Sequence, residues 1–387
     1  MLIGESARRE AVELLEALIR IRSVNPPGEE DRMIGFIENY LSDLGIDAQR
    51  VPLEPGRSSL VARISGTSEG SYVLCGHVDT VDTDAAKWTS TDPFTPRIES
   101  NRMWGLGSAD MKSGVAVILQ TAKEIIRQNV TPPHDLVLAL TADEERAYRG
   151  AASVATSGLI DDARLLLITE PTGGRAYIGQ KGELWLEATF HGQAAHGSVP
   201  TSGVNAILPA VAFCAELQKR SLAFPEISGL GQTSLSIGQF NGGWQVNVVP
   251  DTAKVRLDSR FVTKEERDRV VALVEELGAA CATASGSQFE CCVFNDKARI
   301  VSNPDAPNVK RFLRVHSRVT GRPIEARIAP YSTDAVAIVA QIPVPVLIYG
   351  PGSIEQAHQP DEFVELGSLY EALDVVAGYV SGADGAL

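Results

Sequence analysis

Two hydrophobic periods alternate along the first 179 residues. Apolar residues recur every three to four positions in 5–20 and 29–44, which predicts two amphipathic helices. Further helices are expected at about 113–128 and 153–157. Apolar runs of strand length lie at 46–52, 59–65, 72–76, 136–141 and 163–169. Helices and strands in this order are typical of an α/β sheet that is covered on both faces.

The pattern changes after Thr172. From 183 to 191 apolar and polar residues alternate one by one, as in a strand with one solvated face. The expected elements that follow are a helix at 203–220, strands at 232–240 and 246–260, a helix at 264–283 and a strand at 287–294. This β-α-β-β-α-β order is ferredoxin-like, and its strands can pair among themselves. We therefore predict an inserted second domain at 180–294.

From Pro304 onward the alternation of helices and strands resumes. The expected elements are helices at 305–320, 333–340 and 366–382, with strands at 324–328 and 344–349. The first domain is thus predicted to be discontinuous, with 1–179 and 295–387 together forming one α/β unit. The loop-rich segment 82–108 interrupts it, and ordered loops of that length are usually functional.

Composition excludes several classes of partner. The net charge of the 387 residues is −14, so neither nucleic acid nor an anionic membrane surface is expected to bind. No apolar run is long enough to cross a membrane, and the charged, amphipathic start MLIGESARREAVELL does not resemble a signal peptide. The five cysteines are odd in number and lack C-x-x-C spacing, which predicts reduced thiols in the cytoplasm rather than disulfides or a thiolate zinc site.

The first candidate for chemistry is the segment SYVLCGHVDT at 71–80. His77 and Asp79 follow the strand predicted at 72–76, and positions two apart on an extended chain point to the same side. A metal-bound histidine usually donates its second ring N–H to a carboxylate that fixes its tautomer and orientation, and the carboxylate of Asp79 is placed for that. The alternative is an ordinary polar loop after a strand.

Three further carboxylates lie in predicted loops. Asp110 replaces the third glycine of a nucleotide-like loop, GLGSAD, and precedes a helix, so it is either an N-cap or a metal-bridging carboxylate. Glu144 and Glu145 follow the strand at 136–141. Because adjacent side chains diverge, one can bind a metal while the other shuttles a proton. The alternative for this pair is a solvated loop.

Glu170 ends the strand at 163–169, and His358 follows the strand at 344–349. These six positions therefore fall at the expected carboxyl ends of strands or at a helix start, where open α/β sheets form one crevice. Two imidazoles and several carboxylates without a thiolate suit two Zn²⁺ ions, with Co²⁺ or Mn²⁺ as substitutes.

The sequences of these segments, and their order along the chain, also resemble those of a known family. Several segments are similar to motifs of the M20 metallopeptidases, in the acetylornithine deacetylase/succinyl-diaminopimelate desuccinylase group. These segments are GHVDT, GLGSADMKSG, TADEE, ITEPT, AHGSVP with GVNAI, NVVPD and GPGSIEQAHQPDEF. The resemblance spans about residues 22–363 in collinear order. It implies a zinc-exopeptidase-like catalytic domain with a mixed central sheet, and a lid/dimerisation role for 180–294.

The resemblance also implies roles for the individual residues of the metal centre. His77 and Glu170 would hold one zinc ion, Glu145 and His358 the other, and Asp110 would bridge the two. Asp79 would orient His77, and Glu144 would be the general base. The peptide bond Asp110–Met111 would be cis.

Three residues of the inserted domain match the family as well. The resemblance implies that His196 crosses a dimer interface to support the oxyanion in the partner's site. Asn247 and Arg260 would contact the substrate carboxylate, a task that suits a guanidinium.

The sequence departs from the acetylornithine enzymes at Thr333-Asp334, where they carry Thr-Glu. The follow-on Arg146-Ala-Tyr148 also departs from the family.

The resulting hypothesis is a cytoplasmic, homodimeric two-zinc amidohydrolase that removes an acyl group from a small-molecule N-acyl-L-amino acid. It is expected to be most like an acetylornithine deacetylase. The alternatives on the same scaffold are a succinyl-diaminopimelate desuccinylase and an aminoacylase or dipeptidase. Outside that chemistry, the alternatives are a non-catalytic metal-binding protein and a Rossmann-type oxidoreductase, against which the missing third glycine argues.

Overall fold

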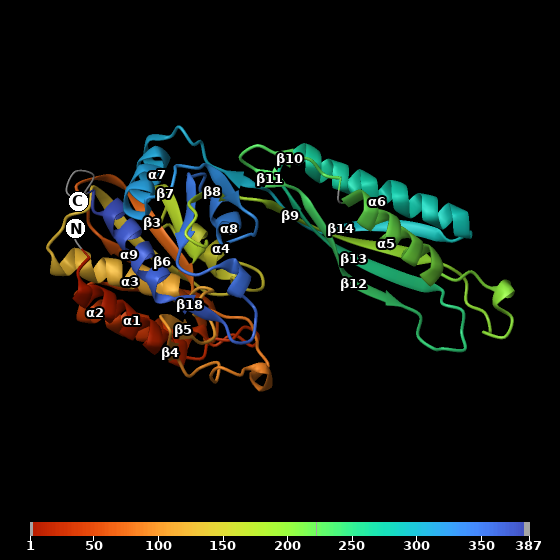
Figure 1. Cartoon of the computed structure of the whole chain (residues 1–387), viewed down its shortest axis with the longest axis horizontal. Helices are drawn as coiled ribbons and strands as arrows, with labels where there is room; N and C mark the ends of the chain where they lie inside the picture. The colour runs from red at the N-terminus through yellow and green to blue at the C-terminus, as the bar shows by residue number, and fades with distance from the viewer. Residues whose placement is uncertain (1–2, 222, 383–387) are drawn as a thin grey trace. The chain divides into compact units, whose positions relative to one another are not determined.

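The computed structural model describes residues 3–221 and 223–382, and they fold into two compact units (Figure 1). Unit 1 contains the chain up to Gly179, then Val301–Ala329, and then the chain from Thr333 onward. Unit 2 contains Gln180–Ile300 and Pro330–Ser332. The return to unit 1 thus comes after Ile300, six residues beyond the predicted 294. Among the described residues, no helix is both long and apolar enough to span a bilayer.

Unit 1 is built on a mixed sheet of nine strands, in the order β1-β2-β6-β3-β7-β17-β8-β15, with β16 paired to β8. Strands β6, β3, β7 and β17 run parallel, whereas β2 pairs antiparallel with β6 and β1 pairs antiparallel with β2. The strands are β1 (Ala48–Glu54), β2 (Arg57–Ile64), β3 (Ser68–His77), β6 (His134–Thr141), β7 (Ala163–Pro171), β8 (Tyr177–Gln180), β15 (Ile300–Val301), β16 (Arg327–Ala329) and β17 (Val346–Gly350). The α/β fold with a mixed central sheet is confirmed.

The register of the parallel strands brings their carboxyl ends to one edge. His77 at the end of β3 lies beside Thr141 at the end of β6. On its other side β3 pairs in parallel with β7, and β17 follows β7 in the same direction. Any residue that follows these four strands therefore starts from the same edge of the sheet, which is where open α/β sheets bind ligands.

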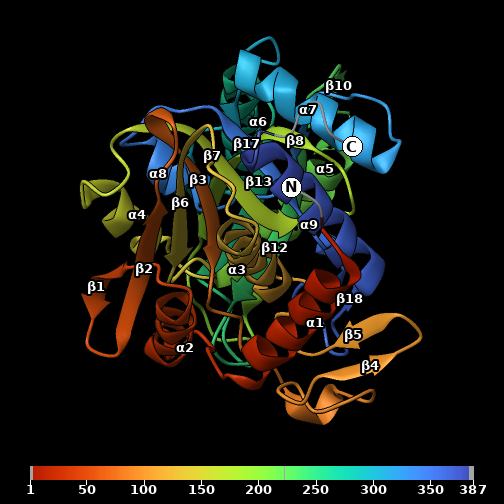
Figure 2. The same ribbon diagram turned by 90° about the vertical axis from the view of Figure 1, so that its left-hand side faces the viewer.

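Helices cover both faces of this sheet (Figure 2). On one face α3 packs against β3, and Gly76 permits a close approach because a Cβ there would lie 3.2 Å from the Cδ1 of Ile118. On the other face α8 begins beside the side chains of Cys75 and Thr141, which its N-cap residue Asp334 contacts. The helices are α1 (Glu5–Arg20), α2 (Glu30–Asp43), α3 (Lys112–Arg127), α4 (Arg149–Thr156), α7 (Pro307–Thr320), α8 (Ala335–Val339) and α9 (Leu366–Val380).

The loop-rich segment contains structure that the hydrophobic pattern did not predict. Strands β4 (Arg97–Glu99) and β5 (Arg102–Trp104) form a small antiparallel sheet with β18 (Phe363–Glu365). The N–H of Gly105 also donates to the carbonyl of Glu362 at 3.0 Å. This small sheet ties the segment before Asp110 to the segment after His358, although some 250 residues separate them in the sequence.

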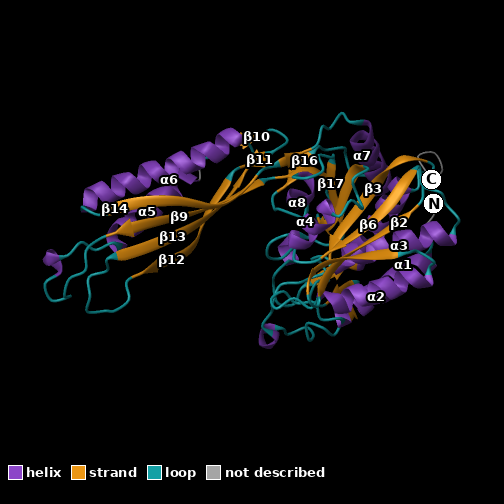
Figure 3. Cartoon of the chain, turned by 180° about the vertical axis from the view of Figure 1, so that it is seen from behind, coloured by secondary structure: helices purple, strands orange, loops and turns teal. Residues whose placement is uncertain are grey.

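Unit 2 is a four-stranded antiparallel sheet in the order β12-β13-β9-β14, with two helices on one face (Figure 3). Its main elements are β9 (Gly182–His191), α5 (Ile207–Ser221), β12 (Ser234–Gly242), β13 (Thr252–Phe261), α6 (Lys264–Ser285) and β14 (Gln288–Lys297), with the short pair β10 (Glu226–Ile227) and β11 (Gly231–Gln232). The alternation in β9 buries Leu184, Leu186, Ala188 and Phe190 under the helices. The predicted β-α-β-β-α-β order of elements is present.

Candidate metal centre

His77 is buried at the carboxyl end of β3, and its two ring nitrogens have different neighbours. Nδ1 lies 2.9 Å from the backbone carbonyl oxygen of Asp79 and must donate its proton there, because a carbonyl only accepts. In the neutral ring, Nε2 then carries the lone pair. Nε2 faces the Oδ1 of Asp110 at 3.1 Å and the Oε1 of Glu170 at 3.7 Å. A lone pair that faces two carboxylate oxygens is stable only if a proton or a cation lies between them.

Asp110 lies between the two predicted ligand histidines. Its Oδ1 faces His77, and its Oδ2 lies 3.5 Å from the Nε2 of His358. The peptide bond to Met111 is cis, as predicted. Met111, rather than Asp110, is the N-cap residue of α3, so the N-cap interpretation of Asp110 is wrong. One carboxylate with each oxygen toward a different imidazole has the arrangement that a bridging ligand requires.

The two adjacent glutamates join different groups of side chains. Glu145 lies 3.0 Å from the Nε2 of His358 and forms one potential ligand cluster with His77 and Asp110. Glu144 is buried and forms a second cluster with His77 and Glu170. Within each cluster the candidate ligand atoms all lie within 4.8 Å of one another. The structure therefore brings all six predicted residues of the centre together at one edge of unit 1.

Burial and mutual repulsion perturb these groups strongly. Burial raises the pKa of Glu144 and of Glu170 well above the usual carboxyl value, and the surrounding negative charges add to this effect. Burial alone would lower the pKa of His77, but the hydrogen bond to Asp110 and the nearby glutamates raise it well above its usual value. The hydrogen bond to Glu145 raises the pKa of His358 to about 9. The centre thus has an excess of negative charge that positive charge would relieve.

The donor set fits divalent cations. The four carboxylates Asp110, Glu144, Glu145 and Glu170 have no lysine or arginine partner among the described residues. The Oε1 of Glu145 is also buried without a hydrogen-bond partner in the described part of the chain. Imidazole nitrogens and carboxylate oxygens without a thiolate are ligands that Zn²⁺, Co²⁺ and Mn²⁺ accept.

Asp79 contributes to the centre in two ways, but the acceptor of the His77 ring N–H is not its carboxylate, as the sequence suggested. Its backbone carbonyl is the nearest acceptor for the His77 ring, whereas its carboxylate oxygen lies farther away, 3.7 Å from Nδ1. The carboxylate instead accepts the backbone N–H groups of Glu144 and Glu145, each at 3.2 Å. Asp79 therefore fixes both the histidine and the two glutamates.

Glu362 is a supporting residue that neither the hydrophobic pattern nor the motifs indicated. Its buried carboxylate accepts the backbone N–H groups of Gly107, Ala109 and Asp110 at 2.7–2.9 Å. Burial raises its pKa to about 8 in spite of these three donors. These bonds fix the backbone that presents Asp110. The only sequence signal was its position in the segment QPDEF that follows His358.

The three predicted residues of unit 2 lie at two ends of its sheet. The exposed residues His196 and Asn247 lie together, because the N–H of Gly197 donates to the carbonyl of Asn247 at 2.7 Å. Arg260 lies near the other end of β13, about 27 Å along the strand from Thr252. Its guanidinium contacts Glu183 at 2.7 Å and Asp258 at 2.9 Å. Within unit 2, His196 and Arg260 are too far apart to contact one small ligand together.

Asp334, in the segment that departs from the acetylornithine enzymes, is buried. It accepts hydrogen bonds from the Thr141 hydroxyl and, at 3.9 Å, from the Cys75 thiol, while its Oδ1 has no hydrogen-bond partner among the described residues. Burial is the main reason that its pKa is raised to about 7. Asp334 therefore links the start of α8 to β3 and β6 near the carboxyl ends of these strands.

Comparisons with known proteins agree with this geometry. Residues 73–382 match the family model described as "Peptidase family M20/M25/M40". An acetylornithine deacetylase of Proteus mirabilis is 30% identical in an alignment 371 positions long that covers 92% of each protein. A probable succinyl-diaminopimelate desuccinylase of Staphylococcus epidermidis is 26% identical in an alignment 397 positions long that covers 95% of this chain and 96% of that protein.

Among solved structures, a tripeptidase from Staphylococcus aureus superimposes with a TM-score of 0.82 at 22% identity, covering 97% of this chain and 98% of the other. The open α/β sheet with imidazole and carboxylate donors at its edge, together with these matches, defines a metal-dependent hydrolase that acts on amide bonds. The chain belongs to peptidase family M20/M25/M40. The resemblance stated from the sequence motifs is confirmed.

Proposed function

We propose that this protein is a cytoplasmic di-zinc amidohydrolase that removes the acyl group from an N-acyl-L-amino acid, with N-acetylornithine as its expected substrate. The observation that carries the proposal is the placement of Asp110 between His77 and His358. The deacetylase relative at 30% identity supports the substrate class. The free thiols of all five cysteines suit a cytoplasmic location.

The residues present would hold two cations. His77 and Glu170 would bind one, Glu145 and His358 the other, and each oxygen of Asp110 would serve one of them. Such ions, when bound, lower the pKa of a coordinated water and polarise the amide carbonyl. The backbone carbonyl of Asp79 holds the His77 tautomer that leaves Nε2 free to ligate.

Glu144 is the residue that would move the proton. Its carboxylate would accept a proton from the attacking water and deliver it to the nitrogen of the departing amine. This role needs a buried carboxylate close to the ligands and separate from the Glu145–His358 pair, and Glu144 meets both conditions. Asp79 limits its movement by accepting its backbone N–H.

Unit 2 is proposed to be a ferredoxin-like lid and dimerisation domain. His196 and Asn247 lie at the end of its sheet opposite to the chain connections at 180 and 300, which suits a role in the site of a second copy. The backbone N–H of Ser198 donates to the Nδ1 of His196, so the neutral ring carries its proton on Nε2, where it can stabilise an oxyanion. Large apolar side chains such as Leu208 and Val211 are exposed on α5, as expected at a homodimer interface.

Replacing His196 with alanine is expected to lower kcat by about 10²–10³-fold, the typical effect of removing one oxyanion donor. KM should change much less, because the interaction forms mainly in the transition state. Steady-state kinetics on the purified variant measure both constants. His134, a half-buried histidine at the start of β6, provides the matched control in His134→Ala. A wild-type kcat for His196→Ala would remove His196 from the mechanism.

The substrate class is tested by incubating the zinc-loaded protein with N-acetylornithine, N-succinyl-diaminopimelate and a panel of dipeptides, and by measuring release of the free amine. We expect the highest kcat/KM for N-acetylornithine. The desuccinylase relative makes N-succinyl-diaminopimelate the second candidate. A preference for dipeptides would replace the proposal with a peptidase activity, and hydrolysis of none of these compounds would contradict it.

A further inference from the structure

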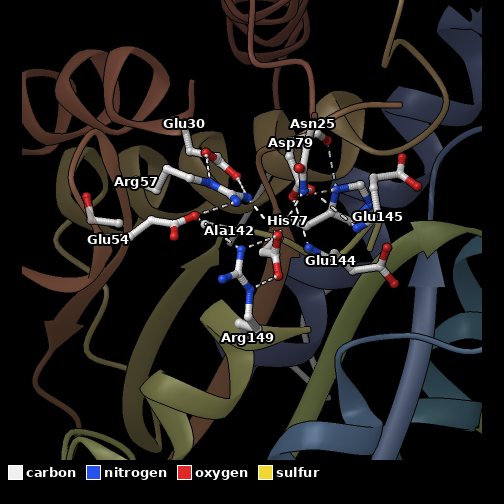
Figure 4. A network of polar contacts seen from close by, with 12 residues as sticks. Asn25, Glu30, Glu54, Arg57, His77, Asp79, Ala142, Glu144, Glu145 and Arg149 are labelled. Atoms are coloured by element: carbon white, nitrogen blue, oxygen red, sulfur yellow. Dashed lines mark hydrogen bonds and ion pairs between the residues drawn. The ribbon is translucent and has the colours of Figure 1, made fainter. Parts of the chain in front are cut away.

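The loop that carries Glu144 and Glu145 is anchored to a chain of buried polar contacts that leads away from the metal centre (Figure 4). The first link is the Asp79 carboxylate, which accepts both of their backbone N–H groups. The residue before the two glutamates is Asp143, a non-glycine residue with a left-handed φ of 65°. Such a conformation persists where the surroundings hold it in place. The contacts of Asp143 show what does so.

Asn25 links Asp79 to Asp143. Its Nδ2 group donates to the Oδ2 of Asp79 at 3.0 Å and to the Oδ1 of Asp143 at 3.1 Å. The backbone of Asn25 is itself fixed beside Asp79, because its N–H donates to the carbonyl of Thr80 at 2.8 Å. One amide group thus joins two buried carboxylates that would otherwise repel each other.

Arg57 on β2 completes the chain of contacts. It is 6% exposed and donates to both oxygens of the fully buried Glu30, at 2.8 and 2.5 Å, and to Asp143 at 2.7 Å. Gly28 makes this packing possible, since a Cβ at that position would lie 2.2 Å from the Arg57 Nε. The half-exposed Arg149 also binds Asp143, but from the solvent side. Arg57 is therefore the buried cation of the network.

We propose that Arg57 and Asn25 are positioning residues for hydrolysis, acting through Asp143 and Asp79 to hold the loop of Glu144 and Glu145 against the metal centre. Arg57 fixes the Asp143 carboxylate. The Asn25 amide donates to both Asp143 and Asp79 and so fixes Asp79 relative to Asp143. The Asp79 carboxylate in turn accepts the backbone N–H groups of the two glutamates. The inference rests on the proposed function, because it assigns these glutamates to proton transfer and metal binding. Outer contacts of this kind typically change activity or metal affinity by 10–100-fold.

The test compares three variants with one control on the zinc-loaded protein. Asn25→Ala breaks the link to Asp79 and leaves every ion pair in place. Arg57→Met removes the buried cation and leaves the charge of Glu30 without its partner, whereas Asp143 still pairs with Arg149. Glu30→Gln/Arg57→Met removes the charge of Glu30 as well. Arg63→Met is the control, because Arg63 lies on the same strand and binds two aspartates that do not contact Asp79. The measurements are kcat and KM on N-acetylornithine, Zn²⁺ affinity by chelator competition, and melting temperature.

We expect Asn25→Ala to lower kcat and to weaken Zn²⁺ binding by about 10-fold or more, with KM nearly unchanged and a melting temperature close to that of Arg63→Met. Glu30→Gln/Arg57→Met should regain melting temperature relative to Arg57→Met without regaining kcat. If Arg57→Met does not fold, the double variant and Asn25→Ala decide. Wild-type kcat and Zn²⁺ affinity in Asn25→Ala would overturn the inference, as would recovery of kcat together with stability in the double variant.

The two proposals fail in distinguishable ways. If the wild-type protein hydrolyses no N-acyl amino acid, the proposed function is wrong, but Zn²⁺ affinity remains measurable. Weaker Zn²⁺ binding by Asn25→Ala than by Arg63→Met would then still support the positioning of Glu145, and equal binding would overturn it.

Discussion

Glu144→Gln is expected to lower kcat by about 10²–10⁴-fold while both zinc ions stay bound. Glutamine keeps the size of the side chain and its hydrogen-bonding capacity, but it cannot take a proton from water at neutral pH. The backbone N–H bond to Asp79 does not involve the side chain and should survive. Single-turnover kinetics together with the metal content of the same sample measure the two effects separately.

The matched control for this experiment is the neighbouring residue. Glu145→Gln should lose metal, because Glu145 contacts His358 and shares a ligand cluster with Asp110. Glu144 itself lies in a cluster with His77 and Glu170, so it could instead be the metal ligand, with Glu145 as the base. Metal analysis of the two variants distinguishes these assignments. If Glu144→Gln lost metal while Glu145→Gln remained loaded, the two roles would have to be exchanged.

Asp110→Asn is expected to remove at least one of the two metal ions and to lower kcat at least as far as Glu144→Gln. In the wild-type protein one oxygen of Asp110 faces His77 and the other faces His358. An amide presents one oxygen and one NH₂ group, and the NH₂ group cannot ligate a cation. Metal analysis and kinetics on the variant measure both losses.

Asp84→Asn is a suitable control for that substitution, since Asp84 is an exposed aspartate of unit 1 that caps a short helical turn. It should retain full metal content and full activity. Two bound ions and near wild-type kcat in Asp110→Asn would show that Asp110 does not bridge the centre.

Much of the centre could be predicted because each of its residues follows an element that the hydrophobic pattern identifies. His77, Glu170 and His358 come at or after the ends of buried parallel strands, and parallel strands end at a common edge. The helix after Asp110 was equally clear. Its N-cap could not be assigned, because the pattern shows where a helix starts but not the backbone conformation before it. Met111 occupies that position.

The supporting residues were harder to predict, because their partners are distant in the sequence. Asn25 lies in a Pro- and Gly-rich segment, and this composition predicts only that the preceding helix ends there. The segment does not indicate that Asn25 contacts Asp143, 118 residues later. Glu362 contacts Asp110 across 252 residues. Polar and charged residues in loops are usually solvated, so their burial becomes evident only when the fold brings their partners together.

The substrate side was predicted only in part for a similar reason. The motifs that contain Asn247 and Arg260 were recognised, but their separation on the sheet depends on the register of β13. Arg260 pairs with Glu183 near one end of β9, whereas Thr252, five residues after Asn247, pairs with His191 at the other. A one-dimensional motif list contains no information about that distance.

The central claim is that unit 1 gathers a dinuclear metal centre around Asp110, and metal stoichiometry tests it most directly. Elemental analysis of the purified, zinc-saturated protein should give two ions per chain, and a His77→Ala/His358→Ala variant with an unchanged melting profile should bind neither ion tightly. A folded wild-type protein that binds no zinc, or a double variant that keeps both ions, would contradict the account.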